Sequence, residues 1–97
     1  MTAEDLSFLP AALQAGVRPG THGGVWHLSQ APDVVAALAA AGRLILGLDI
    51  RDYAADGTFV ETSWSSYTGT DVGEARDRAL EALRQPALPG EWVLITW

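Results

Sequence analysis

One segment in the middle of the chain, RLILGLDIRDYAADGTFVETSW at residues 43–64, constrains the fold more than any other. Two runs of strand-forming residues flank an Ala-Asp-Gly sequence, which is typical of a β-hairpin. A two-residue turn would set Asp52 opposite Glu61, and like charges facing each other across paired strands are unfavourable. A three-residue turn with Gly57 in the left-handed conformation shifts the register by one and sets Arg51 opposite Glu61. We therefore predict the three-residue turn.

That register divides the hairpin into two faces, because successive side chains of a strand point to opposite sides. The apolar face is predicted to hold Leu44, Leu46, Leu48, Ile50, Val60 and Trp64. The polar and aromatic face is predicted to hold Asp49, Arg51, Tyr53, Phe59, Glu61, Ser63 and Ser65. The hairpin thus predicts one sheet face for a core and a second face of mixed chemistry.

Helix signals flank the hairpin on both sides. Before it, a strand over residues 24–28 leads to a helix that Ser29 or Ala31 caps and Gly42 ends. Its predicted buried residues are Val34, Val35, Leu38 and Ala41. After it, Asp71 and Glu74 form a predicted capping box, and a last strand spans residues 91–97.

The N-terminal region is predicted to be helical within residues 2–15, with Ser7 as a cap and Gly16 as the stop. An initial turn over residues 2–6 is an alternative beginning. Residues 18–24, RPGTHGG, are predicted to form an irregular loop because they contain one proline and three glycines.

The order strand–helix–strand–strand–helix–strand in a single domain of 97 residues predicts an α+β fold. We predict a ferredoxin-like split βαβ arrangement: a four-stranded antiparallel sheet with both helices on one face, plus an N-terminal helical extension. The alternative is a mixed α/β sheet in which the first two strands are neighbours. In the first arrangement the strand over residues 44–50 forms an edge, and Ile45 points to the open face. Because an apolar edge favours pairing with another chain, we predict a homodimer.

The composition excludes several kinds of function. Six arginines and no lysine against twelve acidic residues give a net charge of −6, which disfavours nucleic acid and favours a basic protein partner. The absence of cysteine excludes disulfides and thiolate chemistry. No apolar run is long enough to cross a bilayer, so we expect a cytoplasmic protein with no membrane partner.

The sequence assigns no catalytic, cofactor-binding or metal-binding residue. His22 and His27, the two histidines, lack the spacing of a metal site, and the THGG sequence at residues 21–24 lacks the lysine of a P-loop. The hydroxyl-rich run at residues 63–68 contains no Gly-x-Ser-x-Gly elbow. An enzymatic function is therefore disfavoured.

Trp92 and Trp97 are separated by an odd number of residues, so they point to opposite faces of the last strand, and one of them should join the open face. Aromatic side chains beside arginine and carboxylates are typical of protein-binding surfaces. We predict a non-enzymatic acidic interaction module of the inhibitor or immunity type. The alternatives are a small-ligand-binding domain or small enzyme with a pocket at a dimer interface, and a structural subunit. The predicted partner-binding residues are Asp49, Arg51, Tyr53, Phe59, Glu61 and Trp92.

Overall fold

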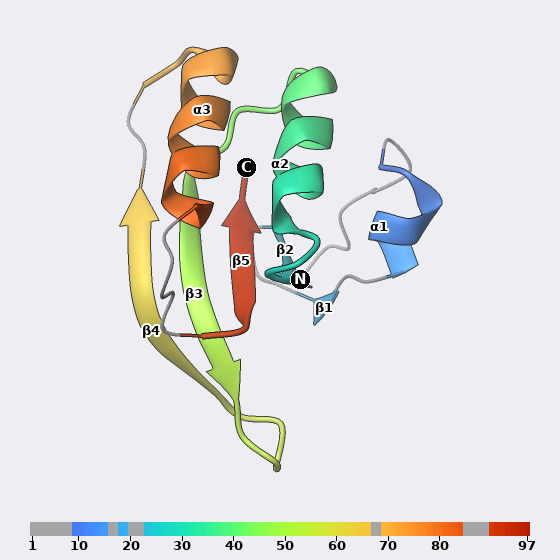
Figure 1. Cartoon of the computed structure of the whole chain (residues 1–97), viewed down its shortest axis with the longest axis vertical. Coiled ribbons are helices and arrows are strands. Elements are labelled where there is room, and N and C mark those ends of the chain that lie inside the picture. The colour runs from blue at the N-terminus through green and yellow to red at the C-terminus, as the bar shows by residue number, and fades with distance from the viewer. Residues whose placement is uncertain (1–8, 16–17, 20–22, 67–68, 85–89) are drawn as a thin grey trace.

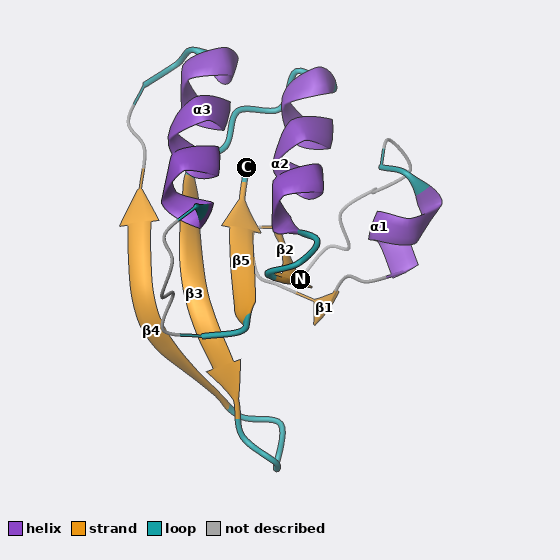
Figure 2. Cartoon of the chain, viewed as in Figure 1, coloured by secondary structure: helices purple, strands orange, loops and turns teal. Residues whose placement is uncertain are grey.

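Two helices lie on one face of an open antiparallel sheet (Figure 1). The structure, a computed structural model, describes residues 9–15, 18–19, 23–66, 69–84 and 90–97, with the backbone alone for Ala15, Arg18, Pro19 and residues 59–65. The helices are α1 (Ala11–Ala15), α2 (Ala31–Ala40) and α3 (Val72–Leu83). The strands are β1 (Arg18–Pro19), β2 (Gly23–His27), β3 (Gly47–Tyr53), β4 (Phe59–Ser66) and β5 (Trp92–Thr96). Figure 2 shows α2 and α3 on the same side of the strands. The predicted α+β class is confirmed.

The strand order is β1-β2-β5-β3-β4, and every pairing is antiparallel. The ferredoxin-like topology is not confirmed, because β5 lies between β2 and β3. The prediction that the strand over residues 44–50 forms an edge is wrong, since β3 pairs with β5 on one side and with β4 on the other. The alternative of a mixed sheet with the first two long strands adjacent is also wrong. Local patterns do not reveal which distant strands will pair, so the order could not be predicted from them.

The predicted hairpin register is confirmed near the turn. Gly57 has a φ of 87°, and Arg51 pairs with Glu61 and Tyr53 with Phe59. Beyond Arg51 the register shifts by one residue, so Ile50 pairs with Ser63 and Thr62 forms a bulge. Trp64 consequently pairs with Asp49 and not with Leu48, which corrects the predicted faces for the second half of the hairpin.

The ends of α2 and α3 follow mainly from local sequence. At the end of α2, Gly42 has a φ of 75° and the Arg43 N–H donates to the Leu38 carbonyl at 2.9 Å, as in a Schellman motif. The predicted caps at its beginning are wrong, because Gln30 is the N-cap and uses no side-chain hydrogen bond. Ala41 is exposed, although it was expected to be buried.

The predicted capping box of α3 is half formed. Asp71 Oδ1 accepts from the Glu74 N–H at 2.9 Å, whereas the Glu74 carboxylate bonds to Arg78. The intrahelical pair of Glu74 with Arg78, four residues apart, replaces the return contact from Glu74 to the N-cap.

The core lies between the sheet and the helices. It includes Trp26, Leu48, Ile50, Val93 and Ile95 from the strands, together with Val34, Val35, Leu38, Ala75 and Ala79 from the helices. The Trp26 Nε1–H donates to the Leu13 carbonyl at 2.8 Å and thereby attaches α1 to β2. The buried alanines of α2 and α3 have short side chains, so these two helices can pack closely in the core.

The stretch before β3 departs from the predicted alternation. Ile45 is 1% exposed and belongs to the core, whereas Leu46 is 42% exposed. The prediction placed Leu46 on the apolar face and Ile45 on the open face, so the structure reverses both assignments. The strand begins only at Gly47, so the period of two did not extend to these residues.

The predicted loop over residues 18–24 is wrong at both ends, because Arg18 and Pro19 form β1, which pairs with Val25 and Gly24, and because β2 begins at Gly23. The expected initial turn, the Ser7 cap, the Gly16 stop and His22 lie outside the described residues. In the described ranges, no helix is long and apolar enough to cross a membrane.

Candidate functional site

The candidate site lies on the face of the sheet opposite α2 and α3, which we call the open face. Trp26, Leu48, Ile50, Val93 and Ile95 belong to the core, so their neighbours in the strands point the other way. Antiparallel register sets His27 opposite Trp92, and Trp92 opposite Arg51. Three strands that are far apart in the sequence thus contribute to one surface.

Three rings form a continuous row on this face, the aromatic row of His27, Trp92 and Tyr53. The Trp92 ring meets the Tyr53 ring at 5.8 Å between centroids with an interplanar angle of 89°. It meets the His27 ring at 5.3 Å and 84°. Both contacts are T-shaped, an arrangement that aromatic quadrupoles favour. All three side chains are half-buried, so each is held by a neighbour and still reaches solvent.

His27 is oriented by the turn that follows β2. Its Nδ1 accepts a hydrogen bond from the Ser29 N–H at 3.2 Å and lies 2.9 Å from the Ser29 Oγ. This supports the predicted structural role of His27. The ring is thereby fixed against Trp92, which lies opposite it in the register.

Asp49 and Arg51 lie beside the aromatic row. Arg51 is 9% exposed, the one charged side chain that is buried in the described part of the chain, and Asp49 is half-buried. Glu61 and Phe59 face Arg51 and Tyr53 in the backbone register, as predicted, while their side chains lie outside the description. The structure therefore brings Asp49, Arg51, Tyr53 and Trp92 to one face and places the backbone of the other two predicted residues next to them.

Val25 and Leu94 belong to the same face by alternation, yet they are 0% and 7% exposed. They lie toward the other end of the strands from Tyr53. The accessible part of the open face is therefore concentrated near the hairpin.

Acidic side chains gather at the hairpin end of the molecule, and we call Asp52, Asp56 and Glu91 the acidic end. All three are exposed. Asp52 Oδ1 accepts from the Glu91 N–H at 3.1 Å, which joins the hairpin to the beginning of β5. Asp52 lies near the end of β3, and its side chain is exposed to solvent.

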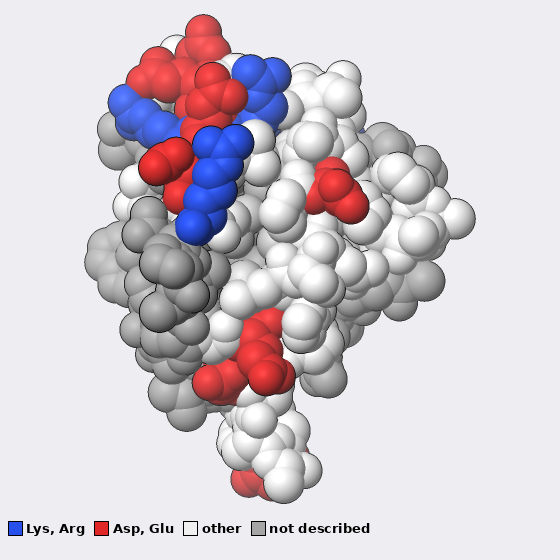
Figure 3. Space-filling model, viewed as in Figure 1, with Lys and Arg blue, Asp and Glu red and all other residues white. Residues whose placement is uncertain are grey.

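The charges over α3 are arranged differently. There Arg76 pairs with Asp77 at 3.0 Å, Arg84 with Glu81 at 3.5 Å, and Arg78 with Glu74. In Figure 3 acidic and basic side chains mix over α3, whereas acidic ones stand alone at the hairpin end. On the face that Figure 3 shows, the negative charges of the acidic end therefore lie apart from the basic side chains.

The turn keeps Asp56 ionised. Asp56 Oδ1 accepts from the Thr58 hydroxyl at 2.7 Å and from the Thr58 N–H at 3.0 Å. These two hydrogen bonds lower the pKa of Asp56 below its usual value, because they favour the charged carboxylate. The Asp56 carboxylate, which is ionised at neutral pH like any aspartate, therefore keeps its charge to a lower pH than usual.

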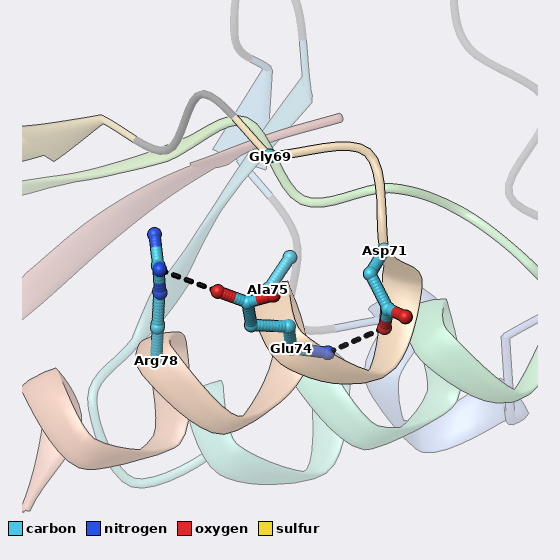
Figure 4. Close-up of a pocket in the computed structure, with 5 residues that line it drawn as sticks. All are labelled: Gly69, Asp71, Glu74, Ala75 and Arg78. Atoms are coloured by element: carbon cyan, nitrogen blue, oxygen red, sulfur yellow. Dashed lines mark hydrogen bonds and ion pairs between the residues drawn. The ribbon is translucent and has the colours of Figure 1, made fainter.

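A shallow pocket lies at the beginning of α3, lined by Gly69, Asp71, Glu74, Ala75 and Arg78 (Figure 4). Its cavity volume of about 10 Å³ is far below the range of roughly 300–1,000 Å³ typical of small-molecule sites. Its polar groups are already bonded to one another through the helix cap and the Glu74–Arg78 pair. Among the side chains that the structure describes, no three His, Asp or Glu residues group as metal ligands.

Sequence reasoning missed His27 as a member of the surface. Alternation along β2 shows only that the side chains of His27 and Trp26 point to opposite faces. The contact of His27 with Trp92 depends on the pairing of β2 with β5. The prediction that one of Trp92 and Trp97 joins the open face is confirmed. Trp92 contacts Tyr53, and Trp97 packs against the core at 6.1 Å from Trp26.

Comparison with known proteins yields no relative: no family model matches the chain, and neither a curated protein nor a solved structure matches it significantly. The open face and the acidic end therefore have to be interpreted from their own geometry.

Proposed function

We propose that this protein is a non-enzymatic interaction module that binds a basic protein through its open face. The observation that carries the proposal is the aromatic row, in which three half-buried rings from three strands contact one another edge to face. Tyrosine and tryptophan dominate the energetics of many protein interfaces because they bury large areas with few rotatable bonds.

Preorganisation supports this role. Trp92 is held between His27 and Tyr53, and His27 is held by Ser29. A side chain that is already ordered loses less conformational entropy when a partner covers it. The row can therefore serve as an anchor without a large ordering cost.

Charge supports a basic partner. The acidic end lies at the same end of the sheet as Tyr53 and Trp92, but alternation along β3 points Asp52 to the side opposite Tyr53, so its charge acts on a partner by long-range attraction and not by contact within the row. Such a surface accelerates encounter with a positively charged protein, and the effect weakens as salt screens it. An inhibitor or immunity-type binder of a basic protein fits this combination. The alternative of a ligand pocket at a dimer interface has no comparable support.

The test uses the purified partner that the chain captures from its host. Trp92→Ala and Tyr53→Ala should each weaken binding in calorimetry by about 30-fold, which corresponds to a hot-spot loss of about 2 kcal/mol. Leu46→Ala is the matched control, since Leu46 is an exposed apolar residue outside the row. Circular dichroism at the assay temperature verifies that each variant is folded.

Two results would contradict the proposal. The first is an unchanged affinity for both row variants. The second is a captured partner whose affinity does not decrease between low and physiological ionic strength, because the acidic end would then have no part in recognition.

A further inference from the structure

The two edges of the sheet differ in a way that points to self-association. At one edge β1 is two residues long and contains Pro19, which has no N–H to offer. At the other edge β4 is eight residues long, FVETSWSS, with no proline and one charged residue (Figure 1). The first edge is short and blunted, whereas the second presents a long row of backbone groups.

A strand edge of this kind is a template for another strand. Proteins usually protect such edges with lysine, proline, short strands or bulges, and β4 has the bulge at Thr62. Glu61 contributes the one charge within the strand. The protection is therefore confined to the middle of β4.

We propose that β4 pairs in antiparallel fashion with β4 of a second copy, so that two sheets join into one across a two-fold axis. A homodimer was expected from the sequence through the strand over residues 44–50, and that basis is gone because β3 is internal. The edge that can make the contact is β4. This proposal is independent of the partner that binds the open face.

The charges of the chain are compatible with a second copy. If the axis lies between Thr62 and Ser63, the bulge falls at the axis and the unprotected ends of β4 pair, residues 59–61 of each copy with residues 64–66 of the other; Glu61 then faces Trp64, and the two carboxylates do not oppose each other. Antiparallel pairing also sends the two hairpins in opposite directions. The two acidic ends, with Asp52, Asp56 and Glu91, then lie at opposite extremes of the dimer, and their repulsion is small.

The decisive measurement is the mass of the wild-type chain by light scattering across a concentration series. We expect the mass to rise from 10.3 kDa toward twice that value as concentration increases. Amide hydrogen exchange should slow within residues 59–66 over the same range. A monomer at every concentration overturns the proposal, and so does a dimer whose β4 amides gain no protection.

A pair of matched variants locates the interface. Thr62→Lys places like charges next to the axis and should raise the dimer dissociation constant by at least about tenfold. Thr70→Lys, an identical change at an exposed residue outside the strand, should leave it unchanged. Equal effects of the two variants would overturn the assignment to β4. If Thr62→Lys does not fold, the wild-type mass and exchange measurements decide by themselves.

Discussion

The two faces of the sheet use the same three strands for different purposes. On the helix side, Trp26, Ile95 and Val93 are completely buried and Leu48 nearly so. On the open side, His27, Asp49, Tyr53 and Trp92 are half-buried. Because alternate residues face opposite ways, the helix side holds the core, while the open side holds these half-buried polar and aromatic side chains near the hairpin.

Trp26 and Trp92 make this difference measurable. Trp26 lies in β2 and Trp92 in the neighbouring strand β5, and their side chains point to opposite faces of the sheet. Trp26 is 0% exposed and bonds to Leu13, while Trp92 is half-buried and rests on two rings. Comparable substitutions should therefore affect stability on one side and binding on the other.

Trp26→Ala should lower the free energy of unfolding by about 3–5 kcal/mol, because it leaves a cavity in the core. It also removes the hydrogen bond that attaches α1 to β2. Urea unfolding measures the loss. Trp26→Phe, which keeps most of the apolar ring and lacks the N–H donor, should lose distinctly less. If Trp26→Ala cost no more than Trp92→Ala, the contrast between the two faces would be wrong.

Trp92→Ala should lower the free energy of unfolding by about 1–3 kcal/mol, from two edge-to-face contacts of roughly 0.5–1.5 kcal/mol each. His27 and Tyr53 lose their common neighbour, so both rings should gain mobility. Unfolding experiments and ring line widths in NMR spectra test this. Tyr53→Ala, which removes one of the two contacts, should cost about half as much.

Gly90→Ala should affect both faces at once. A Cβ at Gly90 would lie 2.6 Å from the Arg51 carbonyl oxygen, so the beginning of β5 would have to move away from β3. We expect a loss of about 1–2 kcal/mol in the free energy of unfolding, together with weaker partner binding. Gly69→Ala is the control, since a Cβ there meets nothing within 4 Å. Full stability of Gly90→Ala would show that the strand can move without cost.

The smallest effect concerns the acidic end and pH. Because the folded protein lowers the pKa of Asp56, the stabilisation from its two hydrogen bonds is present above the pKa of the unfolded chain. It is lost as the pH falls through the lower pKa of the folded protein. Thr58→Val removes the hydroxyl donor and keeps the N–H, so the pKa of Asp56 should rise toward its usual value.

NMR titration of the Asp56 carboxyl group follows this change directly. Thr70→Val serves as the control, because Thr70 is exposed and lies outside the hairpin turn. A pKa of Asp56 that is identical in wild type and Thr58→Val would show that the hydroxyl contact has no influence on the charge of the turn.

Features that depend on neighbours in sequence were predictable. The end of α2 followed from Gly42, the N-cap of α3 from Asp71, and the turn of the hairpin from Gly57. The register near the turn followed from the charges of Arg51 and Glu61. Each of these depends on a backbone conformation or a pair of charges that a few residues define.

The candidate site was predicted in part for the same reason. Asp49, Arg51 and Tyr53 share a face because they alternate along one strand, and Trp92 was assigned by its odd separation from Trp97. His27 was missed, because its position beside Trp92 requires knowing that β2 and β5 are neighbours. The bulge at Thr62 was missed because the charges near the turn constrain only the first pairs of the hairpin.

The sequence by itself determined the turn at Gly57, the end of α2, the N-cap of α3 and which residues share a side between Arg51 and Glu61. Only the tertiary structure decided that β5 enters between β2 and β3, that β4 forms the long edge and that His27 completes the aromatic row. The physical reason is that turns and caps are governed by local backbone energetics, whereas strand order depends on how both helices and all strands bury their apolar surfaces together.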